Sequence, residues 1–235
     1  MQEEHISSVF DRDLEAVQAQ IMKMGGLVEE AIRLAAKSLE TRDGELARDV
    51  RERDRSIDEL EHQINQRAAR ILALRAPTAV DLRLILTVIK ISGNLERIGD
   101  YAKNMAKRTG VLSQLAPVGD SGASIRRMTR LVEAMLKDAL DAYVQRDAAL
   151  AADVIARDED VDQIYNALFR ELLTFMMEDP RNITACMHLH FIAKNTERMG
   201  DHVTSIAEQV TYLVTGNHPD EPRPKADTTS SATEV

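Results

Sequence analysis

One pattern of residues occurs twice in this 235-residue chain, and the repetition limits what the chain can fold into. Asp54-x-x-Ile-Asp58 returns 104 positions later as Asp158-x-x-Val-Asp162. Asn94-Leu-Glu-Arg-Ile-Gly-Asp100 returns 101 positions later as Asn195-Thr-Glu-Arg-Met-Gly-Asp201. Because the matches keep one order along the chain, we interpret the sequence as an internal duplication whose two copies share one fold.

Each copy is predicted to contain three helices, because apolar residues recur three and four positions apart, the spacing of one helix face. In the first copy the helices are expected from about Phe10 to Thr41, from Asp43-Gly44 onward, and from Pro77 in a first turn to about Arg108. In the second copy they are expected at Ile125–Gln145, Ala148–Met177 and Arg181–Thr215. Helices of this length joined by short turns pack antiparallel. The predicted fold class is therefore all-α, with two tandem, pseudo-symmetric three-helix bundles.

The domain boundaries follow from local composition. We assign residues 1–109 to the first repeat and residues 125–216 to the second. Residues 110–124 contain Gly, Pro, Ser and Asp and are expected to form a linker between the repeats. Residues 217–235 are rich in Pro, Thr and Ser without apolar periodicity, so a disordered tail is expected there.

The charge of the chain argues against some classes of partner. The formal net charge is −9 at pH 7, whereas nucleic-acid binding requires a basic surface, so no nucleic-acid partner is expected. No apolar run approaches the length of a membrane span, and the N-terminal residues lack the apolar segment of a secretory signal. The single cysteine, Cys186, suits a reducing compartment. We therefore expect a cytoplasmic protein.

Carboxylates occupy helix positions that the apolar spacing assigns to the core. Asp54 lies between Val50 and Ile57 on the inner side of the second helix, and Asp158 repeats this placement in the second copy. On the third helix of each copy, an apolar row ends in acidic residues. Four pairs with i, i+4 spacing result: Asp54 with Asp58, Glu96 with Asp100, Asp158 with Asp162, and Glu197 with Asp201.

These four pairs suggest cation binding. Like charges one helical turn apart repel, and burial raises the cost of keeping both groups ionised. A divalent or trivalent metal ion would remove both penalties, so iron, manganese, magnesium and zinc are the candidate metals. Gly99 and Gly200, beside the last carboxylate of each copy, would allow close approach of another helix or of ions. The alternative is that the carboxylates are solvated or paired with neighbouring arginines.

Catalysis has no support in the sequence. There is no Ser-His-Asp or Cys-His pairing with suitable spacing and no Gly-rich phosphate-binding loop, so the chain is not expected to be an enzyme. One alternative is a carboxylate-bridged, ferritin-like metal-binding protein, because Glu59-x-x-His62 has the corresponding spacing. However, the counterparts of this motif in the second copy are Gln163 and Asn166. The other alternative is a purely structural helical scaffold, which predicts no metal binding.

Several segments together resemble one known family. They are His5-Ile-Ser-Ser-Val-Phe-Asp11, Arg70-Ile-Leu-Ala-Leu-Arg-Ala-Pro77, Asn94-Leu-Glu-Arg-Ile-Gly-Asp-Tyr-Ala-Lys-Asn104, Met176-Met-Glu-Asp-Pro-Arg-Asn182 and Ala193-Lys-Asn-Thr-Glu-Arg-Met-Gly-Asp-His202. In this order they are similar to the PhoU family of phosphate-signalling proteins, over about residues 3–216.

The resemblance implies a negative regulator of phosphate uptake and of the phosphate-starvation regulon. Such a protein is expected to be a non-enzymatic adaptor between the ATPase of a phosphate ABC transporter and a sensor histidine kinase. A homodimer is expected, with contact to the membrane only through these partners. Some members of the family hold metal clusters on motifs that match Glu96–Asp100 and Glu197–Asp201, with the other two acidic pairs facing them. Because Thr196 replaces Leu95 of the first copy, the two sites are not expected to be equivalent.

Overall fold

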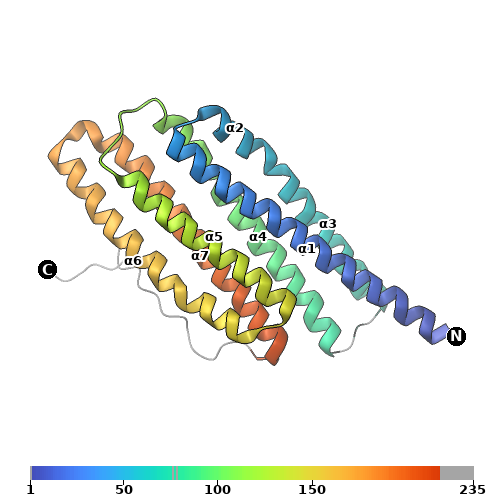
Figure 1. The fold of residues 1–235 in the computed structure, drawn as a ribbon. Helices are drawn as coiled ribbons and strands as arrows, with labels where there is room; N and C mark the ends of the chain where they lie inside the picture. Colours follow the sequence, from blue (N-terminus) through green and yellow to red (C-terminus); the bar gives the residue numbers. More distant parts are fainter. Residues whose placement is uncertain (1, 76, 78, 218–235) are drawn as a thin grey trace.

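The computed structural model describes residues 2–75, 77 and 79–217, and every regular element within these ranges is a helix. The elements are α1 (Gln2–Thr41), α2 (Gly44–Arg53), α3 (Arg55–Arg75), α4 (Ala79–Leu112), α5 (Ser121–Gln145), α6 (Ala148–Glu178), a short 3-10 helix η1 (Pro180–Asn182) and α7 (Ile183–Thr215). Figure 1 shows these helices lying along one common direction, which makes the molecule elongated. The all-α fold class is confirmed.

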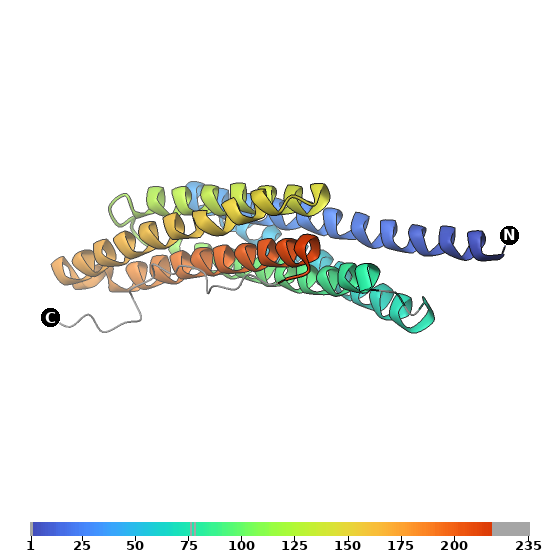
Figure 2. The same ribbon diagram turned by 90° about the horizontal axis from the view of Figure 1, so that it is seen from below.

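The helices form two three-helix bundles that lie side by side. The first bundle contains α1, α4 and the consecutive helices α2 and α3, and the second contains α5, α6 and α7. Two pairs of helices join the bundles: α1 packs on α5, and α4 packs on α7. Figure 2 shows the first pair in one layer and the second pair in the layer below it. The predicted arrangement of two tandem three-helix bundles is confirmed.

The turn after the first helix is built in the same way in both copies. Arg42 and Arg146 have a left-handed backbone, with φ of 55° and 58°, and this conformation ends the preceding helix. The next residue, Asp43 or Asp147, caps the following helix, because its Oδ1 accepts hydrogen bonds from two backbone N–H groups at 2.9 and 3.0 Å. A cap of this kind stabilises a helix by about 1 kcal/mol. The shared turn directs each second helix back along the first.

Several helix ends differ from the sequence prediction. The second helix of the first copy is interrupted at Asp54, whereas its counterpart α6 is continuous. Asp54 keeps helical dihedral angles, with φ −53° and ψ −33°, so α3 continues in nearly the direction of α2. The third helix begins at Ala79, two residues after Pro77.

The connection between the bundles is shorter than the expected linker 110–124. The helix α4 continues to Leu112, and α5 already begins at Ser121. The first helix begins at Gln2, which is eight residues before the expected Phe10. Of the expected tail, all residues after Asn217 lie outside the described part of the chain.

The apolar stripes of both bundles form one continuous core. Its fully buried side chains include Ile21 and Ile32 of α1, Ile91 and Leu95 of α4, and Val203 and Ile206 of α7. Burying such a side chain contributes about 1.5–3 kcal/mol. Four of the buried polar residues are carboxylates: Asp54, Asp158, Asp162 and Glu197. None of the described helices has the length and apolar character needed to cross a membrane.

Candidate functional site

The predicted carboxylates lie between the second and third helices of each bundle. In both copies a glycine on the third helix allows the second helix to come close. A Cβ on Gly99 would lie 3.0 Å from Ile57 Cδ1 and 3.6 Å from Asp54 Oδ1. A Cβ on Gly200 would lie only 2.8 Å from Asp158 Oδ1. The glycines therefore allow the close helix approach that the sequence predicted.

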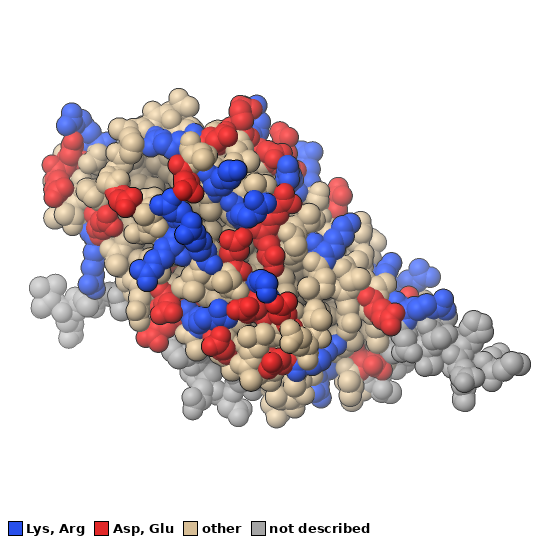
Figure 3. All heavy atoms as spheres, viewed as in Figure 1, with Lys and Arg blue, Asp and Glu red and all other residues tan. Residues whose placement is uncertain are grey.

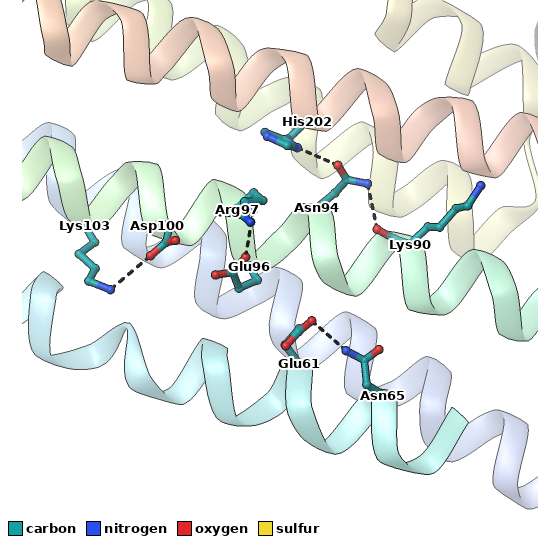
Figure 4. Close-up of polar contacts among 9 residues, drawn as sticks. All are labelled: Glu61, Asn65, Lys90, Asn94, Glu96, Arg97, Asp100, Lys103 and His202. Carbon is teal, nitrogen blue, oxygen red and sulfur yellow. Dashed lines mark hydrogen bonds and ion pairs between the residues drawn. The ribbon is translucent and has the colours of Figure 1, made fainter. Parts of the chain in front are cut away.

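In the first bundle, a lysine connects the carboxylates of two helices. Asp54 is 4% exposed, which confirms its placement in the core. The Nζ atom of Lys103 lies 2.5 Å from Asp54 Oδ2 and 3.2 Å from Asp100 Oδ1, so one ammonium group contacts both side chains. Figure 4 shows Lys103 and Asp100 on α4. Charge-assisted hydrogen bonds of this kind offset the cost of burying Asp54, and hydrogen bonding to Asp54 raises the pKa of Lys103.

Glu96 is the most strongly perturbed carboxylate of this first cluster. Desolvation and then the charge of Asp100 raise its pKa to about 7. Arg97 offsets this only partly, because its Nε atom is 3.6 Å from Glu96 Oε2. Figure 4 shows Glu96 of α4 and Glu61 of α3 in the space between the two helices, and Glu61 accepts a hydrogen bond from Asn65 at 2.8 Å. The space between these helices is therefore rich in negative charge.

Asp58 contributes to the same cluster although its side chain is exposed. Burial and the neighbouring charge of Asp54 raise the pKa of Asp58. The structure therefore brings the four predicted carboxylates of the first copy into one electrostatically coupled group, because Asp58 also acts on Glu96. Asp54 is its buried member, and Asp58, Glu96 and Asp100 are open to solvent to differing extents.

In the second bundle the corresponding carboxylates are buried more deeply. Asp158 and Asp162 are each 4% exposed, and Glu197 is 5% exposed. Lys194 Nζ lies 3.0 Å from Glu197 Oε1 and 5.0 Å from the centre of the Tyr165 ring. Asp201 is half-buried. The second cluster is therefore largely enclosed, whereas the first is partly open to solvent.

Sequence reasoning missed the two lysines that neutralise the clusters. Lys103 follows Asp100 by three positions, and Lys194 precedes Glu197 by three positions. Residues three positions apart are neighbours on a helix surface, so each lysine could have been found on the helix of its carboxylate. The bond from Lys103 to Asp54 has no such signal, because it joins residues that are 49 positions apart.

The arrangement of these carboxylates does not match the predicted metal sites. Within the described residues, no group of three or more His, Cys, Asp or Glu side chains is arranged to hold a metal ion. The positive charge that a cation would supply comes instead from Lys103 and Lys194. The residues as placed do not fit a metal, so metal binding stays a prediction. Elemental analysis of protein purified without chelator tests it, with a variant in which Glu96, Asp100, Glu197 and Asp201 are replaced by Gln or Asn as the control.

The contact between α4 and α7 carries a polar pair near the centre of the molecule. His202 Nδ1 donates to Asn94 Oδ1 at 2.8 Å, and Asn94 Nδ2 donates to the Lys90 carbonyl at 2.9 Å (Figure 4). The His202 ring also lies against the Tyr101 ring, with centroids 5.7 Å apart. Tyr101 and His202 occupy the same position in the two copies, 101 residues apart. The two repeats therefore meet at equivalent positions of their third helices.

The PhoU domain matches this chain twice, over residues 21–109 and residues 125–210. The chain belongs to the PhoU family. Each match covers most or all of the second and third helices that hold one carboxylate cluster, together with about half of α1 or most of α5. The two copies found by internal comparison are therefore two PhoU domains.

Relatives of known name align with almost the whole chain. The phosphate-specific transport system accessory protein PhoU homolog of Caulobacter vibrioides is 46% identical over 97% of this chain and 99% of its own length. The homolog of the same name in Rhizobium meliloti is 43% identical over 98% of both chains. The crystal structure of PhoU from Pseudomonas aeruginosa superposes with a TM-score of 0.85 at 41% identity, over 88% of this chain and 100% of that one.

Proposed function

We propose that this chain is a negative regulator of phosphate uptake and of the phosphate-starvation regulon. In this proposal it works in the cytoplasm as a non-enzymatic adaptor between the ATPase of the phosphate ABC transporter and a sensor histidine kinase. The single observation that carries the proposal is the presence of two PhoU domains in one chain whose full-length relatives are named as accessory proteins of phosphate-specific transport. An accessory and regulatory role in phosphate transport follows from these relatives.

The arrangement of the bundles supports an adaptor role. An adaptor has to present different surfaces to different partners, and the two clusters differ although their sequences are duplicated. The first bundle leaves Glu96 and Asp100 partly exposed, whereas the second encloses Glu197 beneath Lys194. Long helical faces lie open on both sides of the elongated molecule (Figure 2). The first carboxylate cluster is our proposed docking surface for one partner.

Complementation tests this function directly. In a Caulobacter vibrioides strain that lacks its own homolog, the chain should restore low expression of phosphate-starvation genes and normal phosphate uptake in phosphate-rich medium. A reporter fusion and uptake of radiolabelled phosphate measure the two effects. Failure of this chain to restore repression, when the native homolog restores it, would contradict the proposal.

Two further measurements separate the parts of the proposal. Replacing Glu96 and Asp100 by Gln and Asn should weaken repression if the first carboxylate cluster docks a partner, and full repression by this variant would exclude that surface. Sedimentation of the purified chain tests the homodimer, because a monomer at micromolar concentration would contradict it.

A further inference from the structure

A cavity of about 270 Å³ lies where the two bundles and their connection meet. The end of α1, the end of α4 and the beginning of α5 line it, and so does α7. Leu39, Leu112 and Leu189 provide apolar walls, and Arg42 and Arg126 stand among the polar lining residues. A space of this size and mixed lining can receive one bulky side chain together with its backbone.

The rim of the cavity is held in place by arginines from both bundles. The guanidinium of Arg42 donates hydrogen bonds to the Leu112 and Leu115 carbonyls, which ties the end of α1 to the end of α4 and to the connection. Arg126 of α5 forms an ion pair with Glu40 of α1 across the bundle interface. The cavity is therefore preformed, and a ligand bound there would touch both bundles.

A group of cations extends from this cavity along the face formed by α1 and α5. We call it the basic patch, and it consists of Arg33, Lys37, Arg126 and Arg130. Arg33, Lys37 and Arg130 are exposed, and no ion pair joins these three to a carboxylate of another described residue. Figure 3 shows Lys and Arg atoms gathered on this half of the face, with acidic atoms concentrated further along it. In a chain with a net charge of −9, such a local excess of positive charge attracts acidic ligands.

The residues of the basic patch are mostly not repeated at the equivalent positions of the other copy. Positions related to Lys37 and Arg33 by the repeat are Asp141 and Lys137, and those related to Arg126 and Arg130 are Met22 and Gly26. Lys137 pairs with Asp141 at 2.7 Å, so the related end of the face carries no comparable excess of positive charge. The cations and the cavity coincide at one end of the α1–α5 face only.

From this coincidence we propose that the junction cavity and the basic patch together bind an acidic segment of a partner protein, with one bulky apolar side chain inserted into the cavity. The inference rests on the proposed adaptor function and names how one partner is recognised. The apolar anchor fills the space between Leu39, Leu112 and Leu189. The Asp and Glu residues of the segment lie along the basic patch.

The charge of the rim favours a peptide over a small free anion. Glu40 and Asp120 also line the cavity, so a small anion inside it would meet carboxylates as well as arginines. A segment of several residues reaches beyond them to Lys37, Arg33 and Arg130, where positive charge prevails. Binding of this kind weakens as salt screens the charges, with a screening length of about 10 Å at 0.1 M ionic strength.

Peptide selection tests the proposal on the full chain. A library of random 12-residue peptides is selected against the protein, and a selected peptide is labelled with fluorescein for anisotropy titrations. We expect enrichment of peptides rich in Asp and Glu with one Leu, Phe or Met. Replacing that apolar residue by Ser, or raising NaCl from 50 to 500 mM, should each weaken binding at least 10-fold. Absence of acidic peptides among those selected would overturn the proposal.

Three variants identify the surface. The double substitution Lys37→Ala and Arg130→Ala should weaken binding at least 10-fold, and Ala123→Leu, which fills the cavity, should do the same. Lys137→Ala at the related end of the face is the matched control and should leave the affinity within twofold. Equal binding by the double variant, or equal weakening by the control, overturns the assignment even if Ala123→Leu fails to fold.

Binding to phosphatidylglycerol vesicles in place of acidic peptides would assign the basic patch to a membrane and would also overturn the proposal. Complementation by the unmodified chain is scored separately, so failure here leaves the proposed function standing.

Discussion

The two carboxylate clusters share one repeated sequence pattern, but the lysine that pairs with the carboxylates lies at a different position in each copy. In the first bundle, Lys103 lies one turn after Asp100, and its counterpart in the second copy is Thr204. In the second bundle, Lys194 lies one turn before Glu197, and its counterpart in the first copy is Gly93. A buried carboxylate needs a compensating charge within reach. The compensating lysine can therefore lie on either side of the acidic pair while the carboxylates keep their positions.

The position of the lysine also decides how open each cluster is. Lys194 lies over Tyr165, and Tyr165 replaces Glu61 of the first copy. An aromatic ring and a lysine therefore cover the second cluster, whereas the first has the carboxylate of Glu61 at the position of the ring. The Glu96 side chain accordingly keeps 24% of its surface exposed, compared with 6% for that of Glu197.

The largest expected effect comes from removing the lysines. Lys194→Met leaves Glu197 buried without its ammonium partner and should lower the free energy of unfolding by about 3 kcal/mol. Lys103→Met should cost less, about 1–2 kcal/mol, because Lys103 is more than one third exposed and solvent screens its charge. Urea unfolding followed by circular dichroism measures both. A larger loss for Lys103→Met would reverse our ranking of the two clusters.

A smaller difference is expected between the two glycines. Alanine at either position gains about 1 kcal/mol of helix propensity. At Gly99 the new Cβ meets the flexible end of Ile57, so we expect Gly99→Ala to be nearly neutral. At Gly200 it meets the carboxylate of buried Asp158, so Gly200→Ala should destabilise the protein by about 1–2 kcal/mol. Thermal unfolding of the pair checks this, and equal midpoints would show that Asp158 can move aside.

The smallest effect is a pH dependence that comes from Glu96 of the first cluster. The folded state holds the Glu96 proton up to about pH 7, whereas the unfolded chain releases it near the ordinary pKa of 4.5. Stability therefore falls as pH rises through this window. Glu96→Gln should be more stable than the parent by about 1 kcal/mol at pH 8 and equal to it at pH 4. Urea unfolding at both pH values is the measurement, and a benefit at pH 4 alone would contradict the sign.

Much of the fold was predictable because helical periodicity and duplication act together. The spacing of Val50, Asp54 and Ile57 placed an acid in the core, and Asp54 is buried there. The interruption at Asp54 was not predictable, because the spacing of apolar residues is the same in α6, which is continuous. Helix ends near Pro77 and Ser121 shifted for a similar reason, since periodicity locates a helix better than its first residue.

The positions of the repeated carboxylates were predictable, but the lysines beside them and the difference in exposure between the two clusters were not. Like-charge spacing singled out the eight carboxylates, yet the repeated motifs gave no reason to expect a partly exposed cluster in one copy and an enclosed one in the other. That difference depends on Tyr165 in place of Glu61 and on contacts between different helices, such as Lys103 with Asp54. Contacts of this kind exist only after the helices have packed.

The contact between Tyr101 and His202 bears on how the chain came to be a single polypeptide. If each repeat were a separate, identical subunit, a residue on the symmetry axis would meet another copy of itself. Two tyrosines or two histidines would face each other there, and any substitution would occur on both sides at once. Covalent fusion of the repeats releases this constraint. In the fused chain one of the two equivalent positions is His202, which donates to Asn94, and the other is Tyr101. The contact at the centre of the molecule is therefore asymmetric.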